Sequence, residues 1–322
     1  MKKIFILFVS MFALVSCNNE QINSITDTPV KNSQEVLEFC TRIDSLNYYY
    51  SSMTLLDTRK GYISSHIRSS CADSVGRYIG GKICSWVGGS IGTLFGNPVT
   101  VYAGIVFGKH FGGAAGSAVA SIGAEWLMDR FVSRSDLNSS LVLDPNYVIP
   151  IEDYNNLTDG ELHNLILVEL LNNIDNYVLS DGNLNYDLLL EDALIIENKY
   201  TPIEDFELYK EYWKPLAVEQ TKRIVNQTPL LNSAGNEAFL EGVYYSLIPE
   251  LQVTKEEFDN ANLLSEKVLS TYILLDDVTL VEFSTDVDTA IETSELDSSL
   301  KSDLKVSNSV LTNSVLIWRE VQ

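Results

Sequence analysis

Residues 76–124 read GRYIGGKICSWVGGSIGTLFGNPVTVYAGIVFGKHFGGAAGSAVASIGA, and every fourth position of this stretch carries a small residue. Nine of these positions are glycines: Gly76, Gly80, Gly88, Gly92, Gly96, Gly104, Gly108, Gly112 and Gly116. Residues four apart lie one above another on a helix, so the column forms a groove that another backbone can approach closely. Each Gly in a helix interior costs roughly 0.8–1 kcal/mol relative to Ala. The column therefore predicts helices that depend on tight packing against a partner surface.

A break in the middle of the stretch divides it into two helices. Pro98 has no backbone N–H and restricts Asn97 before it. We therefore expect helices over about 73–95 and 99–131, folded back on each other as a glycine-rich hairpin. The pattern resembles the glycine-zipper segments of bacterial envelope lipoproteins and of some membrane-active peptides. That resemblance covers about 50 of the 322 residues and implies a packing mode, not an activity.

Two environments are open for this hairpin, a protein core and a membrane. The longest uncharged run, 83–108, is interrupted by the Asn-Pro break. The resulting pieces are shorter than the ~20 residues that a membrane-spanning helix needs. Lys82, Lys109 and His110 bound them, which also disfavours a simple membrane span.

The amino terminus is typical of a signal peptide, because Lys2 and Lys3 precede an apolar run over 4–15. The run ends in Leu-Val-Ser-Cys at 14–17, which resembles the lipobox of bacterial lipoproteins. The alternative is an ordinary secretory peptide.

The lipobox resemblance implies that residues 1–16 are removed and that Cys17 is lipidated, so the chain would be held at the membrane. By the sorting logic of that family, Asn18 in place of Asp disfavours retention in the inner membrane. We therefore expect the outer membrane of the cell envelope as the destination. Residues 17–34 are rich in Asn, Ser and Thr and are predicted to form a polar tether.

Charge divides the remaining chain. Residues 1–150 carry 12 Lys+Arg and 11 Asp+Glu, whereas 151–322 carry 10 and 33. So acidic a surface repels phosphate backbones, which excludes nucleic-acid binding as a leading function. It would attract cations or a basic partner, and the commoner explanation is a solvated acidic face. We expect a helical region over 35–135, a linker over 136–156 and an acidic all-α domain over 157–322.

Hydrophobic spacing predicts helices almost throughout. Thr158-Asp-Gly-Glu161 and Thr254-Lys-Glu-Glu257 both look like capping boxes at helix starts. An all-α helical bundle is the simplest architecture for this pattern. Besides the hairpin and the helix that follows Thr158, the helices are expected at about 35–56, 59–72, 186–199, 203–226, 234–248, 254–275, 277–292 and 296–318.

Three cysteines remain apart from Cys17, namely Cys40, Cys71 and Cys84. Outside the cytoplasm two of them can pair, and an odd number leaves at least one free thiol. Their pairing stays open, and small buried side chains are the simpler interpretation. No Cys/His metal-binding spacing occurs in the sequence, so no metal or other cofactor is expected.

The turn Gly160-Glu161-Leu162-His163-Asn164 places a carboxylate, an imidazole and an amide at a helix start. Such a cluster is what an acid–base site would use. The competing interpretation is structural, with Glu161 reaching back to the cap and His163 on a partly exposed surface.

A second candidate site is the acidic stretch 181–192. It has oxygen-bearing residues at the first, third, fifth and twelfth positions of a calcium-binding EF-hand loop. Tyr186 replaces the glycine that makes the sharp turn, and Asp192 replaces the usual bidentate Glu. We therefore favour a polar connection between helices, with Asn and Asp as turn and cap residues.

The expected function is a structural or binding role in a lipid-anchored envelope protein that contains a tightly packed glycine-zipper hairpin. Two alternatives remain open. One is a membrane-perturbing effector whose hairpin inserts into a bilayer, and the other is an envelope enzyme that uses Glu161 and His163.

Overall fold

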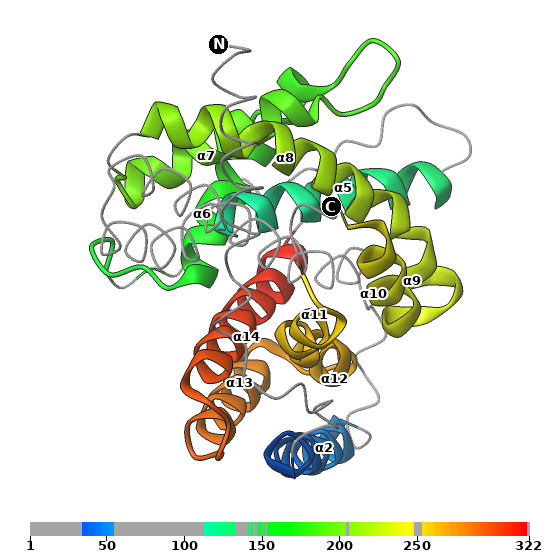
Figure 1. Cartoon of the computed structure of the whole chain (residues 1–322), viewed down its shortest axis with the longest axis vertical. Helices are drawn as coiled ribbons and strands as arrows, with labels where there is room; N and C mark the ends of the chain where they lie inside the picture. Colours follow the sequence, from blue (N-terminus) through cyan, green and yellow to red (C-terminus); the bar gives the residue numbers. More distant parts are fainter. Residues whose placement is uncertain are drawn as a thin grey trace, which may run out of the picture.

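The computed structural model is helical wherever it describes the chain (Figure 1). The described residues are 34–54, 113–132, 141, 143, 147–149, 151, 153–203, 206–247, 253–272 and 274–320. Within them no β-sheet forms, and an isolated bridge joins Val178 to Leu184. The predicted all-α class is therefore confirmed.

The helices, in chain order, are α2 (Gln34–Thr54), α5 (Gly113–Val132), α6 (Asp159–Leu171), the 3-10 helix η2 (Ile174–Tyr177), α7 (Tyr186–Tyr200), α8 (Phe206–Gln227), α9 (Pro229–Ser233), α10 (Gly235–Ser246), α11 (Lys255–Ala261), α12 (Leu263–Tyr272), α13 (Asp277–Glu292) and α14 (Ser298–Trp318). Most lie within a few residues of the predicted ranges. The helices predicted at 59–72 and 73–95 lie outside the described residues, as does the start of the one at 99–131.

One predicted helix, 254–275, is wrong as a single element, because the structure divides it into α11 and α12 at Asn262. Asn262 is fully buried, and both its backbone N–H and its side-chain amide donate to the carbonyl of Phe258, at 3.1 and 2.9 Å. A side chain that bonds to a nearby carbonyl competes with the helical pattern. The start of α11 is as expected, since Thr254 Oγ1 accepts the Glu257 N–H at 3.1 Å.

Helix α5 lies inside the bundle, where α6, α7 and α8 pack against it (Figure 1). Every residue from 113 to 125 is buried. A helix that is buried all round needs apolar or small residues on every face, and the sequence GAAGSAVASIGA supplies them. Among the helices of the described residues, none combines the length and the apolar character needed to cross a bilayer.

Small residues let α5 approach its neighbours closely. A Cβ atom added to Gly123 would lie 2.6 Å from Val225 Cγ2 on α8 and 2.9 Å from Tyr186 Cε1 on α7. Gly123 does not belong to the column of small residues at every fourth position. The members of that column that the structure describes are Gly116, Ala120 and Ala124. These three are also buried, so the small residues of α5 face contacts on several sides, not along a single groove.

The amino-terminal end of α5 is capped from a different helix. No acidic residue lies in its own first turn, but the Glu197 carboxylate of α7 accepts the Ala115 N–H at 3.1 Å. Glu197 is only 1% exposed. A carboxylate is favourable at a helix amino terminus because unpaired N–H groups and the helix dipole are positive there.

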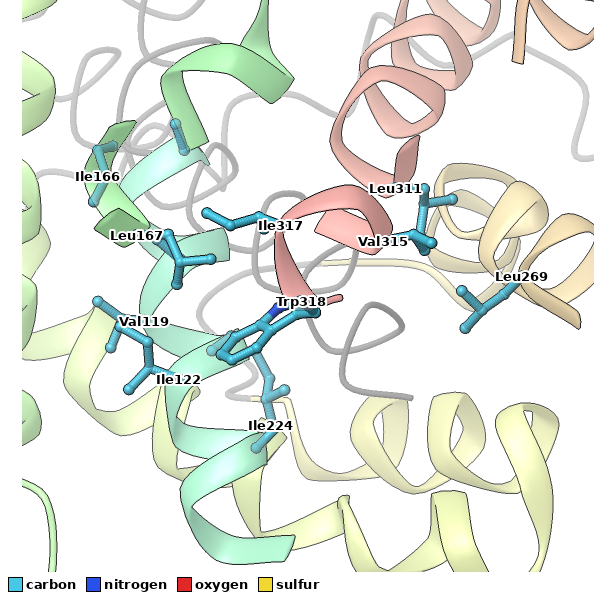
Figure 2. Close-up of a cluster of buried hydrophobic side chains, with 14 of the residues drawn as sticks. Val119, Ile122, Ile166, Leu167, Ile224, Leu269, Leu311, Val315, Ile317 and Trp318 are labelled. Carbon is cyan, nitrogen blue, oxygen red and sulfur yellow. The ribbon is translucent and has the colours of Figure 1, made fainter. Parts of the chain in front are cut away.

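Helix α14 connects two groups of helices: its carboxyl-terminal half contacts α5 and α6, and it also packs against α11, α12 and α13. Figure 2 shows Ile317 and Trp318 pointing toward the side chains of α5 and α6, while Leu311 and Val315 face Leu269 of α12. The fully buried Trp318 donates its indole N–H to Ser121 Oγ on α5 at 2.6 Å. Helix α14 therefore contributes side chains to the core around α5 and α6 and to the core around α12.

Helix α2 packs at the far end, against α12 and α13 (Figure 1). Tyr50 donates its hydroxyl to Asp286 at 2.7 Å, and the Asn47 amide donates to the Lys267 carbonyl at 2.9 Å. Phe39 and Ile43 are buried in the same contact. The predicted regions 35–135 and 157–322 thus contribute helices to one hydrophobic core.

Helices α6 and α14 come close enough at Gly160 that no side chain fits. An added Cβ would lie 2.8 Å from the Ser309 carbonyl carbon and closer still to its oxygen. The Gly160 N–H donates to Ser309 Oγ at 3.1 Å, and one turn along, Asn164 Nδ2 donates to the Asn313 carbonyl at 3.2 Å.

We expect Gly160→Ala to destabilise the protein by about 1–3 kcal/mol, as overpacking does, although Ala is intrinsically the better helix former by roughly 1 kcal/mol. The obstructing atoms are the amide nitrogen of the Asn313 side chain and the carbonyl group of Ser309, and the latter belongs to the α14 backbone and cannot rotate away. Gly242→Ala is a matched control on α10, where the nearest atoms end the flexible side chains of Gln227 and Leu230. Urea unfolding measures both variants. Equal or greater stability of Gly160→Ala than of Gly242→Ala would contradict the close crossing.

Candidate functional site

Helix α6 begins with the predicted capping box, which is confirmed. Thr158 Oγ1 accepts the Glu161 N–H at 3.2 Å. In return, the Glu161 carboxylate accepts the Thr158 N–H at 2.7 Å and the Thr158 hydroxyl at 2.8 Å. The Glu161 carboxylate is therefore engaged in starting the helix.

His163 lies in the interior, with 0% of its surface exposed. The expectation of a partly exposed His163 is wrong, because this face of α6 packs into the core. Its Nδ1 lies 2.9 Å from Asn164 Oδ1. Asn164 Nδ2 donates to the Asn313 carbonyl, so its oxygen faces the imidazole and Nδ1 carries the proton.

Tyr147 completes this polar cluster. Burial, and then the charges of Glu320 and Asp277, raise the pKa of Tyr147 to about 12, while a hydrogen bond with the Asn164 side chain acts in the opposite direction. At neutral pH the phenol is therefore protonated and available only for hydrogen bonding. This cluster orients α6 within the core.

The structure does not bring Glu161 and His163 into an acid–base pair. Residues two apart on a helix point to different sides, and each of these side chains has its own local partner. A general base must lie within hydrogen-bond reach of a substrate proton, which a fully buried imidazole does not offer. The enzyme alternative therefore gains no support from these two residues.

The stretch 181–192 forms a tight turn and then a helix. Asp181 accepts the Asn183 N–H at 2.9 Å, Gly182 has φ +79°, and Asn185 caps α7 by accepting the Leu188 N–H at 3.2 Å. From Tyr186 onward the residues are helical, so they cannot wrap around an ion. No group of three His, Cys, Asp or Glu side chains arranged for a metal occurs among the described residues.

Millimolar calcium should therefore produce no saturable rise in melting temperature, because a ligand stabilises a protein only by binding the folded state. Differential scanning fluorimetry of the wild type and of Asp181→Ala, each with calcium and with magnesium, measures this. A saturable shift that calcium causes and Asp181→Ala abolishes would re-establish the EF-hand interpretation.

The carboxyl-terminal end of α6 borders a cavity of about 470 Å³, a size within the usual range of ligand pockets. Its apolar lining consists of Leu141, Leu143, Leu171 and Ile174, which are all buried. Its polar lining consists of Asn172, Asn173, Asp175 and Asn176, which are all exposed. The cavity thus has an apolar floor and a rim of amides with one carboxylate.

This cavity was not among the sites predicted from the sequence. Leu141 and Leu143 fall in the range interpreted as a linker, where no periodicity marks them as buried. The sequence feature that could have indicated this cavity is the run Asn-Asn-Ile-Asp-Asn at 172–176, which directly follows the apolar positions of α6. Amides gathered at a helix end supply donors and acceptors without acid–base chemistry.

The other predicted site residues are only partly covered by the structure. Cys17, the glycines from Gly76 to Gly112, Cys71 and Cys84 lie outside the described residues. Gly116 is buried in α5. Cys40 on α2 is a free, half-buried thiol, and burial raises its pKa; a raised pKa lowers thiolate reactivity.

Comparisons of the chain with protein-family models, with curated proteins and with solved structures found no match.

Proposed function

We propose that this chain is a lipid-anchored protein of the bacterial cell envelope, held at the outer membrane through Cys17, whose helical body has a structural or binding role. The observation that carries the proposal is the Leu-Val-Ser-Cys boundary at 14–17, directly after an apolar run with a basic start. The polar residues that follow it provide a tether between anchor and body.

Two structural observations support binding over catalysis. Glu161 and His163, which carry the enzyme alternative, are engaged in a helix cap and in a buried polar cluster. The cavity beside α6 is lined by amides and aliphatic side chains, with Asp175 as its ionisable group. Such a lining can recognise a ligand by shape and hydrogen bonding.

Cys17→Ala should leave the protein unprocessed or release it from the membrane fraction, since a thiol is the attachment point for the lipid. Fractionation and mass spectrometry of the mature amino terminus test this. Ser16→Ala is the matched control and should remain membrane-bound. An unmodified Cys17 at the mature wild-type terminus would refute the anchor.

A second candidate function, perturbation of a membrane, is favoured by one observation. Residues 113–125 are enclosed on all sides by protein, which is how a helical bundle would shield an apolar segment before releasing it. The acidic surface of 151–322 would keep such a shielded form soluble.

Dye release from liposomes separates the two candidates. For a packed structural helix we expect no release by the purified Cys17→Ala chain, because expelling α5 would expose the hydrophobic core around it. Dye release by the Cys17→Ala chain that is lost when Gly123→Leu is added, with the protein still folded by circular dichroism, would favour the membrane-active function.

A further inference from the structure

Helix α2 lies at one end of the molecule and carries an exposed strip without charges (Figure 1). The strip consists of Leu37, Thr41, Ser45, Tyr48 and Ser52, whose spacing places them on one side of the helix. This side is opposite the one that packs against α12 and α13. Tyr48 is 80% exposed and Leu37 46% exposed. Two large side chains of this strip, called the α2 strip below, are therefore open to contact.

The hydroxyl groups of the serines and the threonine in the α2 strip are bonded to the helix itself. Thr41 Oγ1 donates to the Leu37 carbonyl at 2.8 Å, and Ser45 Oγ donates to the Thr41 carbonyl at 2.9 Å. Ser52 Oγ donates to the Tyr49 carbonyl at 2.7 Å. A polar group that already has a partner loses less when water is removed from it. The strip can therefore lie against a less polar surface at a small desolvation cost.

The exposed valines of α13 have different surroundings. Val278 is 71% exposed and Val281 49% exposed, but the carboxylates of Asp277 and Glu282 lie next to them in the chain and are also exposed. Burying these valines would bring two carboxylates to the contact. The α2 strip does not have this disadvantage, because its own members are all uncharged.

The position of α2 in the chain indicates what the α2 strip contacts. Sixteen residues, 18–33, separate Cys17 from the start of the helix. A flexible chain of this length spans about 20–24 Å on average and less than about 60 Å when fully extended. A lipid on Cys17 would hold α2 close to the bilayer at an effective concentration in the millimolar range. A contact of only millimolar affinity would then be occupied.

We infer that the α2 strip lies on the headgroup surface of the zwitterionic phospholipid bilayer that carries the anchor. The inference rests on the lipidation of Cys17 proposed above. Tyrosine suits this boundary, since its ring can be buried while its hydroxyl stays in water. Zwitterionic lipids are favoured over anionic ones because residues 151–322 carry 33 Asp+Glu against 10 Lys+Arg, and anionic headgroups repel so acidic a body.

The test holds position 17 at a bilayer without the natural lipid. A hexahistidine tag replaces residues 1–17 of the full chain, and the tag binds phosphatidylcholine vesicles that contain a nickel-chelating lipid. Hydroxyl-radical labelling read by mass spectrometry measures the exposure of Tyr48. Tyr245 on α10, which is 74% exposed, is the internal reference. We expect the labelling of Tyr48 relative to Tyr245 to fall at least threefold on the vesicles.

Two variants add the same charge at different exposed positions. Leu37→Glu places a carboxylate in the α2 strip and should return the labelling of Tyr48 on vesicles to within about 1.5-fold of the free chain. Val278→Glu is the matched control on α13 and should leave Tyr48 protected. Both side chains are exposed, and circular dichroism checks that both variants are folded.

Unchanged labelling of Tyr48 on the vesicles, or protection that persists in Leu37→Glu, would overturn the inference. So would stronger protection on phosphatidylglycerol vesicles, which are anionic. Equal protection of the tagged chain without vesicles would assign the α2 strip to a second copy of the protein, which would also overturn it. Because the tag replaces the lipid, this result is independent of whether Cys17 is lipidated, and mass spectrometry of the mature terminus tests the envelope proposal separately.

Discussion

The enclosure of α5 is the constraint on which the rest of the structure depends. Residues 113–124 of α5 are mainly Gly, Ala and Ser, so this part of the helix has little side-chain surface to bury and depends on neighbours that approach its backbone closely. Gly123 meets Val225 and Tyr186 at such distances. The positions of α7 and α8 therefore follow from the small side chains of α5, and bulkier residues there would separate the three helices.

Two polar groups in this interior form hydrogen bonds between α5 and other helices. Glu197 caps α5 from α7, and Trp318 bonds to Ser121 from the end of α14. An unsatisfied buried polar group costs roughly 1–3 kcal/mol, so each of these bonds opposes alternative packings. Each one also restricts the direction from which a neighbouring helix can approach α5.

Helix α6 has different surroundings at its two ends. Near its amino terminus Gly160 and Asn164 fit against α14, and His163 is sealed in the core. At its carboxyl terminus the chain turns through amides that border the cavity. The close crossing with α14 fixes the position of the helix that leads into this rim.

Local patterns in the sequence determined the helical class, the start of α6 at Thr158 and the extent of α13, because capping and hydrophobic spacing act over a few residues. The same patterns favoured a polar connection over 181–192 with Asn and Asp as turn and cap residues, and Asn185 is such a cap. The burial of His163, the cap from Glu197 and the cavity next to Asp175 were decided by tertiary structure alone. Each depends on which distant helices meet, and helical spacing shows that a face is buried without identifying what covers it.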